Sequence, residues 1–517
     1  MKPTPPNIIL LILDTTRRDR LSLYGADRPT SPHLSEFAEK GAVYHRAVAP
    51  AQWTIPSHTS LFTGTMPSVH GVTQSNSRIA SEQKVLAEYL QEAGYHTVAF
   101  CNNPLVGVLN NGLQRGFEHF YNYASAVPHR PNDHKKFWLR REFSRRFRPF
   151  ARKVGNQFAL SDTMFRVALN PLFTPVWTRF INFKGNTAHS ISDTIDYWQA
   201  HVQGGNAQPI FAFINLMEAH LPYWPSNDAL DKVAPTLRAD RAEWQRRRQF
   251  VQQFNADGAA WASPPEPPLS DWQQEALLDF YDAELAQQDA HMGRLFSYLE
   301  QSGQMENTVV MIAADHGEGH GDHQLFGHGF NVHQELVHVP LVIRGERFEP
   351  RDITQVTSTR HLFETVLDLA SVEMSDLLQS QIDLHSLASS ATSQSTPTQT
   401  HIGYSEAYAV NTFLNVLEHN NPSVIERMLL RETYRCLYED DLKLILRQDE
   451  PIALYNIQAD PQETRNLLYN QPDQVQALVS KVQALNAHQT HKYQTENYNE
   501  EDEAQVAEHL RALGYIE

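Results

Sequence analysis

Short apolar runs along this chain end abruptly in polar residues. Two of them, Ile8–Leu13 and Val309–Ala314, stop at Asp14 and at Asp315-His316. A short apolar run bounded by turn residues is typical of a strand buried in an α/β sheet. Because ligand sites in such sheets lie at the carboxyl ends of strands, the pattern predicts that Asp14 and Asp315 meet at one sheet edge. Taken alone, an Asp after a strand is more often a turn or helix cap.

Longer segments have the apolar periodicity of helices. Asp271–Gln301 is predicted to form a long amphipathic helix, and Pro472–His488 a second helix whose first turn contains the proline. Cys436–Leu446 predicts a strand hairpin, and the proline-rich stretch Trp261–Ser270 predicts a loop. The residues on the apolar side of the first helix, which we assign to the core, are Leu277, Leu278, Tyr281, Leu285, Met292 and Leu295.

The composition of one segment suggests a division of the chain. Ser389–Thr400 is rich in Ser, Thr and Gln and is predicted to be a mobile linker. It would separate a catalytic part, residues 1–388, from a smaller C-terminal α+β part, residues 401–517. A chain of 517 residues is long enough for two such parts.

Charge and cysteine content narrow the function classes. The formal charge of -17 argues against a nucleic-acid binder, because phosphate backbones would be repelled. Cys101 and Cys436 cannot form a disulfide framework; one bridge stays possible, and reduced thiols are the simpler interpretation. The first apolar run is too short for a membrane span and lacks a small-residue cleavage site. We therefore expect a cytoplasmic protein.

A basic insertion at residues 128–153 stands out in this acidic chain. Its cations are interleaved with aromatic side chains, so an amphipathic helix could lie on an acidic membrane surface through residues 130–153 or grip an anionic substrate. It could equally pack its aromatic face on the domain and leave the basic face solvated. The cations are Arg130, Lys135, Lys136, Arg140, Arg141, Arg145, Arg146, Arg148, Arg152 and Lys153, and the aromatics are Phe137, Trp138, Phe143, Phe147 and Phe150.

The segment after the Val309–Ala314 run is dense in potential metal ligands. Carboxylate and imidazole groups beside flexible glycines suit a divalent cation. Any single histidine here is more simply a solvated polar residue, and not all of the group can be ligands. The group comprises Asp315, His316, Glu318, His320, Asp322, His323, His328, His333 and His338.

A hydroxyl residue precedes a predicted helix start in Thr54-Ile55-Pro56-Ser57-His58. Proline in a first turn and free backbone N–H groups suit an anion held next to a nucleophile. The alternative is that Thr54 or Ser57 is an ordinary N-cap.

The order of these motifs resembles the sulfatase family of the alkaline-phosphatase superfamily. The resemblance spans almost the whole chain, and the order and spacing of the motifs make it specific. The motifs are Leu13–Arg17, Thr54–Gly64, Gly94–Thr97, Asn215–Tyr223, Asp315–Glu318, Val339–Arg344 and Leu454–Leu467. It implies an α/β fold, a doubly wound mixed sheet flanked by helices as in alkaline phosphatase, with a smaller C-terminal α+β part.

The same resemblance implies roles by position. Asp14, Asp315 and His316 match ligands of one divalent metal ion, which can be Ca, Mg, Mn or Zn. Thr54 matches the nucleophile and would complete the metal shell. The other matched positions are His220 and His328, which contact the transferred group or protonate the leaving oxygen, and His58, Asn102 and Asn103, which replace the family's usual substrate-binding residues.

The nucleophile position departs from the family pattern. Sulfatases usually present Cys-x-Pro-x-Arg, in which Cys or Ser is oxidised to formylglycine; Thr54 and His58 stand at those ends. Oxidation of threonine would give a ketone, so we expect an unmodified alcohol that attacks directly. The chain is thus predicted to hydrolyse sulfate or phosphate esters, with a preference for phosphate mono- or diesters. The alternatives are an arylsulfatase-type enzyme, a phosphotransferase and a catalytically silent anion-binding member.

Overall fold

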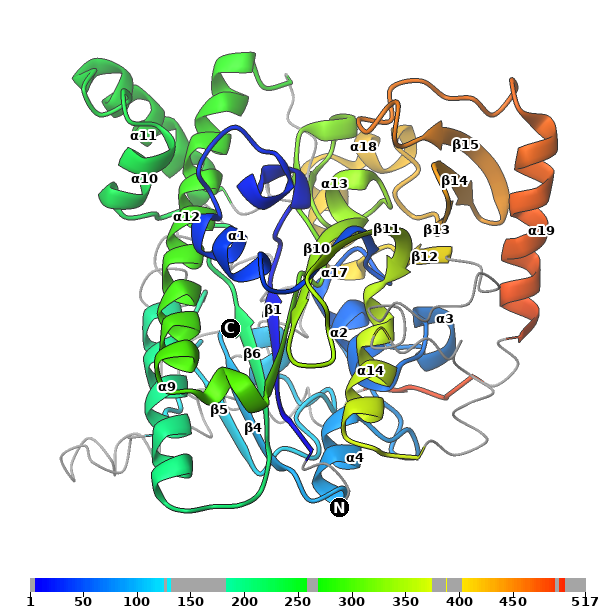
Figure 1. The fold of residues 1–517 in the computed structure, drawn as a ribbon. Helices are drawn as coiled ribbons and strands as arrows, with labels where there is room; N and C mark the ends of the chain where they lie inside the picture. Colours follow the sequence, from blue (N-terminus) through cyan, green and yellow to red (C-terminus); the bar gives the residue numbers. More distant parts are fainter. Residues whose placement is uncertain are drawn as a thin grey trace, which may run out of the picture.

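The computed structural model describes residues 5–124, 128–131, 183–257, 268–373, 387, 402–488 and 492–497. Within them the chain forms a large mixed sheet enclosed by helices and a smaller antiparallel sheet near its C-terminal end (Figure 1). The predicted α/β architecture, with a doubly wound mixed sheet and a smaller α+β part, is confirmed.

The larger sheet has eight strands within the described residues, in the order β11-β2-β10-β7-β1-β6-β4-β5. All of them run parallel except β10, which is antiparallel to β2 and β7. The strands are β1 (Asn7–Leu13), β2 (Ala42–Val48), β4 (His96–Cys101), β5 (His119–Asn122), β6 (Ile210–Leu216), β7 (Thr308–Ala313), β10 (His338–Arg344) and β11 (Arg351–Ser358).

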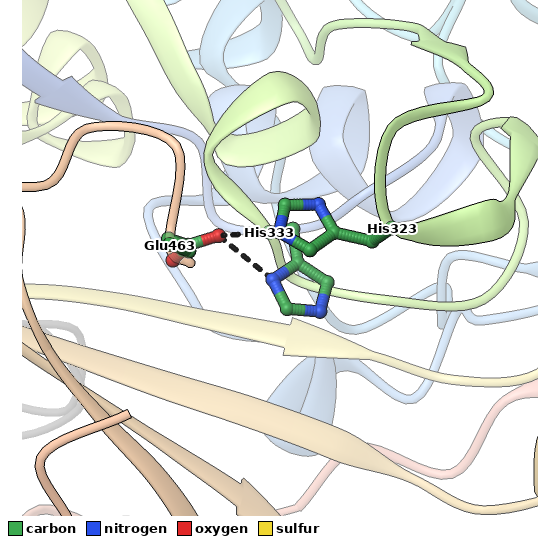
Figure 2. Close-up of side chains that lie close together, drawn as sticks. All are labelled: His323, His333 and Glu463. Atoms are coloured by element: carbon green, nitrogen blue, oxygen red, sulfur yellow. Dashed lines mark hydrogen bonds and ion pairs between the residues drawn. The ribbon is translucent and has the colours of Figure 1, made fainter. Parts of the chain in front are cut away.

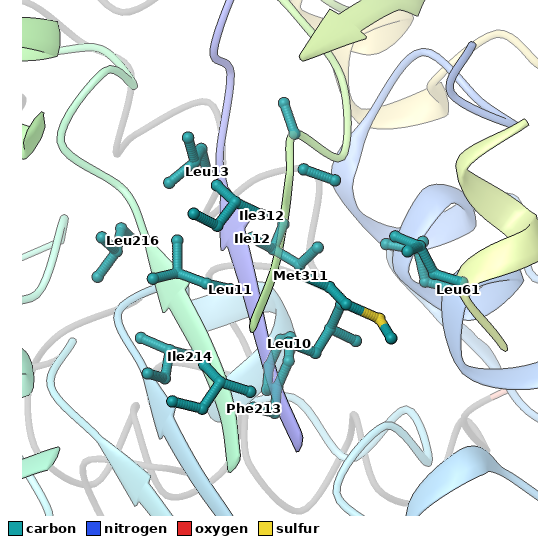
Figure 3. Packing of buried hydrophobic residues seen from close by; sticks show 14 of the residues in the cluster. Leu10, Leu11, Ile12, Leu13, Leu61, Phe213, Ile214, Leu216, Met311 and Ile312 are labelled. Atoms are coloured by element: carbon teal, nitrogen blue, oxygen red, sulfur yellow. The ribbon is translucent and has the colours of Figure 1, made fainter. Parts of the chain in front are cut away.

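Strand β1 lies inside the sheet between β6 and β7. Leu11 is paired with Ile214 of β6 and with Ile312 of β7, and all three side chains are fully buried (Figure 3). A parallel strand covered on both faces carries an almost continuous apolar run, which explains why Ile8–Leu13 has no alternating polar positions.

Helices cover both faces of the large sheet (Figure 1). On one side α12 packs against α1, α9, α10 and α11, and on the other α2 packs against α3, α4 and α14. The helices are α1 (Pro32–Ala38), α2 (Thr54–Thr63), α3 (Pro67–His70), α4 (Leu86–Glu92), α5 (Pro104–Gly107), α9 (Thr187–Gln203), α10 (Asn227–Val233), α11 (Arg241–Ala256), α12 (Asp271–Gln301), α13 (Gln334–Val337) and α14 (Leu362–Leu369).

The smaller sheet has the order β12-β13-β14-β15, and all its neighbouring strands are antiparallel. Helix α19 covers one face, where Leu478 and Val482 join a cluster with Leu444 and Leu454. The elements of this region are β12 (Ile402–Ala407), α17 (Asn411–Asn420), α18 (Pro422–Arg427), β13 (Tyr434–Glu439), β14 (Leu442–Arg447), β15 (Glu450–Asn456) and α19 (Pro472–His488).

Two small ribbons complete the described elements. Strand β3 (Ser77–Arg78) pairs with β16 (Glu496–Asn497), and β8 (Gly319–His320) pairs with β9 (Phe326–Gly327). The second ribbon lies within the histidine-rich segment and gives it a defined path.

Most predicted elements are present. The two apolar runs form β1 and β7, the long helix is α12, the hairpin is β13 and β14, and the last helix is α19. Cys101 and Cys436 are buried free thiols, so the disulfide that the sequence left open is absent. Among the helices of the described ranges, none combines the length and apolarity that crossing a membrane requires.

Other predictions fall on residues outside these ranges. The linker 389–400 and nearly all of the basic insertion 128–153 lie there, as does most of the proline-rich loop. The division into residues 1–388 and 401–517 therefore stays a prediction.

Replacing Leu11 with alanine should lower the free energy of unfolding by about 2–5 kcal/mol. The substitution leaves a cavity between β6 and β7 that the surrounding buried side chains cannot fill. Urea unfolding followed by tryptophan fluorescence measures the change. Val202→Ala is the control, since this side chain is 42% exposed on α9 and its loss should change stability by less than about 0.5 kcal/mol. Equal unfolding midpoints for both variants would contradict the assignment of β1 to the core.

Candidate active site and metal centre

The carboxyl ends of β1 and β7 bring two carboxylates together. Ile12 of β1 is in register with Ala313 of β7, so Asp14 and Asp315 follow adjacent strand ends on the same sheet edge. Asp14, Asp315 and His316 are completely buried, and one ligand atom from each lies within 4.8 Å of the others. The structure thus brings together the three side chains that the sequence proposed as ligands.

These three groups present hydrogen-bond acceptors to one another. His316 Nδ1 donates to the carbonyl oxygen of Gly317 at 2.8 Å, so Nε2 carries a lone pair, and it lies 3.3 Å from Asp315 Oδ2. Asp14 Oδ1 and Asp315 Oδ2 have no hydrogen-bond partner among the described residues. Buried acceptors that face each other are stabilised by a proton or a metal cation between them.

The titration properties of the group fit the same conclusion. Burial raises the pKa of Asp14 to about 6, although the hydrogen bond from Asn103 acts in the opposite direction. Burial, with the charge of Asp14, raises the pKa of Asp315 well above its usual range, and burial lowers the pKa of His316 well below it. Two buried carboxylates beside a neutral imidazole fit a divalent cation, and this donor set accepts Ca, Mg, Mn or Zn.

Thr54 lies beside this group at the beginning of α2. Its Oγ1 is 3.2 Å from His316 Nε2, and Thr54 is 1% exposed. No side chain caps the helix at Trp53, so the first backbone N–H groups of α2 are available next to the hydroxyl. Ser57 Oγ donates to the carbonyl oxygen of Asp315 at 2.7 Å, which fixes the helix to the end of β7. Thr54 is therefore the first residue of α2 and not its N-cap.

His58 is buried behind Thr54. Its Nδ1 donates to the carbonyl oxygen of Thr54 at 2.9 Å and lies 3.4 Å from Asp315 Oδ2, while its Nε2 lies 3.4 Å from the side-chain nitrogen of Asn215. Burial lowers the pKa of His58 to about 4, so it is neutral at pH 7. This histidine supports the helix start and Asp315 and brings no positive charge to the site.

The two asparagines predicted to bind substrate lie in different environments. Asn103 donates through Nδ2 to Asp14 Oδ2, and its Oδ1 accepts from the backbone N–H of Leu105 as the cap of α5. Asn102 donates to Ser190 Oγ at 2.9 Å and to the carbonyl oxygen of Asn215 at 3.0 Å. Because both amide hydrogens of Asn102 form hydrogen bonds within the protein, its side chain has no free N–H to donate to a substrate.

The rings of His220 and His328 are in edge-to-face contact, with centroids 5.3 Å apart, and the centroid of the His328 ring is 4.5 Å from that of His316. His220 Nδ1 donates to the carbonyl oxygen of Leu221 at 2.6 Å, and His328 Nδ1 lies 3.0 Å from Glu318 Oε1. Both rings therefore keep Nε2 for a substrate.

The pKa values of these two histidines move in opposite directions. Burial, with the neighbouring His328, lowers the pKa of His220 to about 4. Burial also opposes protonation of His328, but the carboxylates of Glu318 and Asp14 outweigh it and raise its pKa. A pair of imidazoles with separated pKa values suits different tasks in proton transfer.

Two residues at the site were not assigned a role from the sequence. Glu318 is buried, contacts His328, and has no hydrogen-bond partner at Oε2 within the described ranges. Asn215 is the last but one residue of β6 and lies next to His58. Its Oδ1 has no hydrogen-bond partner among the described residues. A polar residue at the end of an apolar strand was the available signal for Asn215.

The remaining histidines of the dense segment lie elsewhere. His320 Nε2 is 2.8 Å from the Tyr223 hydroxyl, and His338 Nε2 donates to the carbonyl oxygen of His45 at 2.9 Å. His323 and His333 stack on each other with ring centroids 3.7 Å apart. Of the six histidines, the fold therefore brings His316 and His328 to Thr54 and the carboxylates.

Comparisons with known proteins identify the family of the chain. The family model for sulfatases matches residues 6–372 of the chain. The uncharacterized sulfatase YidJ of Escherichia coli (strain K12) is 22% identical over 465 residues, which cover 90% of this chain and 83% of that protein. An arylsulfatase of Clostridium perfringens is 22% identical over 394 residues, covering 72% of this chain and 76% of its own.

A solved structure has the same fold. The phosphonate monoester hydrolase of Agrobacterium radiobacter superposes with a TM-score of 0.63 at 18% identity, over 94% of this chain and 96% of that chain. With the family model matching most of its length, the chain belongs to the sulfatase family of ester hydrolases.

Proposed function

We propose that this protein is a metal-dependent hydrolase of phosphate mono- or diesters that uses the hydroxyl of Thr54 as its nucleophile. The observation that carries the proposal is the position of Thr54 Oγ1, buried at the amino end of α2 and 3.2 Å from His316 Nε2. Asp14, Asp315 and His316, with Thr54, would hold the divalent ion. The substrate would be an anionic small-molecule ester.

The reaction has two displacements. The Thr54 hydroxyl gives its proton to solvent, Oγ1 bonds to phosphorus, and the bond from phosphorus to the leaving oxygen breaks as that oxygen takes a proton. Water then attacks phosphorus, which releases phosphate or a monoester and restores the hydroxyl. A bound divalent ion would lower the pKa of the Thr54 hydroxyl and offset charge on the transferred group.

The chain itself supplies the groups around the transferred phosphoryl. The backbone N–H groups at the start of α2 point toward an anion next to Thr54. His220 and His328 have their Nδ1 atoms engaged, so each can offer Nε2 to a phosphoryl oxygen or to the leaving oxygen. His58 keeps the helix start and the Asp315 carboxylate in place.

The preference for phosphate follows from the chemistry of threonine. A formylglycine hydrate has a second hydroxyl through which sulfate is expelled by elimination, and a sulfated threonine lacks it. A phosphothreonine is still opened by water attacking phosphorus. The fold by itself does not distinguish sulfate esters from phosphate esters. Structures of this fold include a phosphonate monoester hydrolase and a protein solved with D-glucosamine-2-N,6-O-disulfate, which is 17% identical to this chain with a TM-score of 0.62.

The alternatives are distinguishable by substrate. An arylsulfatase would turn over aryl sulfate best, a phosphotransferase would need an acceptor other than water, and a silent member would bind an anion without turnover. The presence of Asp14, Asp315, His316 and a hydroxyl at position 54 favours retained chemistry. Membrane contact through residues 130–153 and a cytoplasmic location stay predictions.

Asp315→Ala should lose the divalent ion, because it removes the buried carboxylate between Asp14 and His316. Metal analysis of dialysed protein measures this, with Asp352→Ala, an exposed carboxylate on β11, as the control. If Asp315→Ala and wild type carry the same metal content, this ligand assignment is wrong.

Replacing His220 or His328 with alanine should lower kcat by about a hundredfold or more, the usual range for a group that transfers a proton or holds a developing charge. His419→Ala, an exposed position on α17, is the control and should keep wild-type turnover. Wild-type rates in either of the first two variants would remove that histidine from the reaction.

Thr54 should be unmodified in the purified protein, as checked by intact mass and peptide mapping, and Thr54→Ala should abolish turnover. Thr59→Ala on the same helix is the control, because its hydroxyl donates to the carbonyl oxygen of Ile55 and not to the site. In a matched set of aryl sulfate, phosphate monoester, phosphate diester and phosphonate substrates, a phosphate ester should be turned over best. Full activity of Thr54→Ala, or a preference for aryl sulfate, would refute the proposed nucleophile chemistry.

A further inference from the structure

A second group of metal-ligand side chains lies outside the active site. Figure 2 shows His323, His333 and Glu463 together, and one ligand atom from each lies within 4.8 Å of the others. His323 follows the β8 strand, His333 precedes α13, and Glu463 comes from the loop after β15. The group therefore connects the segment that carries His328 to the C-terminal sheet.

The hydrogen bonds of His323 determine which of its nitrogens is free. Its Nδ1 lies 3.1 Å from Glu335 Oε1, and a proton between them makes Nδ1 the donor. The Nε2 lone pair then faces Glu463 Oε2 at 3.9 Å, which is too long for a hydrogen bond. A carboxylate that orients a histidine in this way is the usual second partner of a metal-binding imidazole.

Both carboxylate oxygens of Glu463 have buried partners. It is completely buried, and its Oε1 forms an ion pair with the buried Lys443. Its Oε2 accepts from the backbone N–H of Gln334 at 3.0 Å and contacts His333 Nδ1 at 2.7 Å. Burial opposes its ionisation, but Lys443 and His333 outweigh this effect and hold the pKa of Glu463 well below its usual range. An anionic oxygen is therefore always directed at the two rings.

The two imidazole rings stack on each other. They are parallel within 5°, with centroids 3.7 Å apart, and two imidazolium ions in that arrangement would repel. The stack places one nitrogen of each ring within 4.8 Å of the other and of a Glu463 oxygen. His323 and His333 are 22% and 21% exposed, so small molecules and ions reach them.

A route for an ion is present. His323, Glu335 and Glu463 contribute to the wall of a cavity of about 970 Å³, which also includes Arg17, Asp322 and Gln334. Most ion-pairing groups in that wall already have partners: Arg17, for example, contacts Asp19 and Asp322. His323, His333 and Glu463 form a compact nitrogen and oxygen donor set, and His323 and Glu463 are reached from this cavity.

We propose that His323, His333 and Glu463 form a second metal site that binds Zn²⁺, with Glu335 positioning His323 and solvent completing the coordination. Two imidazole nitrogens and one carboxylate oxygen suit zinc and are poor ligands for Ca²⁺ or Mg²⁺, which prefer oxygen. Binding displaces the proton shared by His333 and Glu463. The site would clamp residues 323–333, which include His328, to the C-terminal sheet.

The test uses the full-length protein, stripped with a chelator, reloaded with Zn²⁺ and dialysed, followed by metal analysis and isothermal titration. Wild type is expected to bind two equivalents and Asp315→Ala one. His323→Asn combined with His333→Asn should lose one equivalent in either background, while His419→Asn, on the exposed surface of α17, should lose none. Because the count is made in the Asp315→Ala background, failure of this site and failure of the catalytic metal site give different results.

A second variant tests the site without removing a ligand. Glu335→Gln should weaken the affinity of this site for Zn²⁺ by about 10–100-fold, the usual effect of losing a carboxylate that orients a histidine. In the Asp315→Ala background, Co²⁺ should give a visible spectrum that the double histidine variant lacks. The proposal is overturned if Asp315→Ala binds no Zn²⁺, or if the double histidine variant, with circular dichroism and a thermal midpoint like those of His419→Asn, keeps the same number of equivalents.

Discussion

The structure depends on the burial of two like charges at adjacent strand ends. Asp14 and Asp315 are completely buried and lie together because β1 and β7 are parallel neighbours. Two buried carboxylates cannot both stay ionised without a nearby cation, since burial and mutual repulsion each favour the protonated form. The lone pair of His316 and the hydroxyl of Thr54 face the same point, so the surrounding groups present acceptors and leave the positive charge to an ion.

The histidines around the two carboxylates differ in pKa and in role. His58, where the family usually has a cationic residue, is neutral and holds the start of α2 against Asp315. Burial lowers the pKa of His220 to about 4, so it is also neutral at pH 7, whereas the Glu318 carboxylate outweighs burial and raises the pKa of His328. The proposed alcohol nucleophile at the beginning of α2 thus shares its site with two imidazoles whose pKa values are shifted in opposite directions, which suits the transfer of a phosphoryl group and a proton.

The C-terminal part is attached to this site by a further buried carboxylate. Glu463 is paired with Lys443 of β14 and reaches His333, which lies in the same segment as His328. Truncating either member of such a buried pair leaves an uncompensated charge, so the connection fixes the relative position of the small sheet and the active-site segment. The C-terminal sheet thus helps to hold the segment that carries His328, a proposed catalytic residue, although it contributes none of the proposed reacting atoms.

The sequence alone determined two strands of the large sheet, the C-terminal hairpin, two helices and the strand ends at which chemistry should occur, because apolar runs and periodicity are local properties of the chain. It also identified Thr54, Asp14, Asp315 and His316, since each follows or begins an element whose end is visible in the pattern. Among the clustered histidines the family resemblance indicated His316 and His328, but only the tertiary structure decided where the other four lie, because their positions depend on contacts between distant segments. Only the tertiary structure, likewise, shows that the amide group of Asn102 donates to Ser190 Oγ and to the carbonyl oxygen of Asn215 in β6. Hydrogen-bond partners far apart in the chain leave no periodic signal, so only the folded arrangement shows which polar side chains remain free for a ligand.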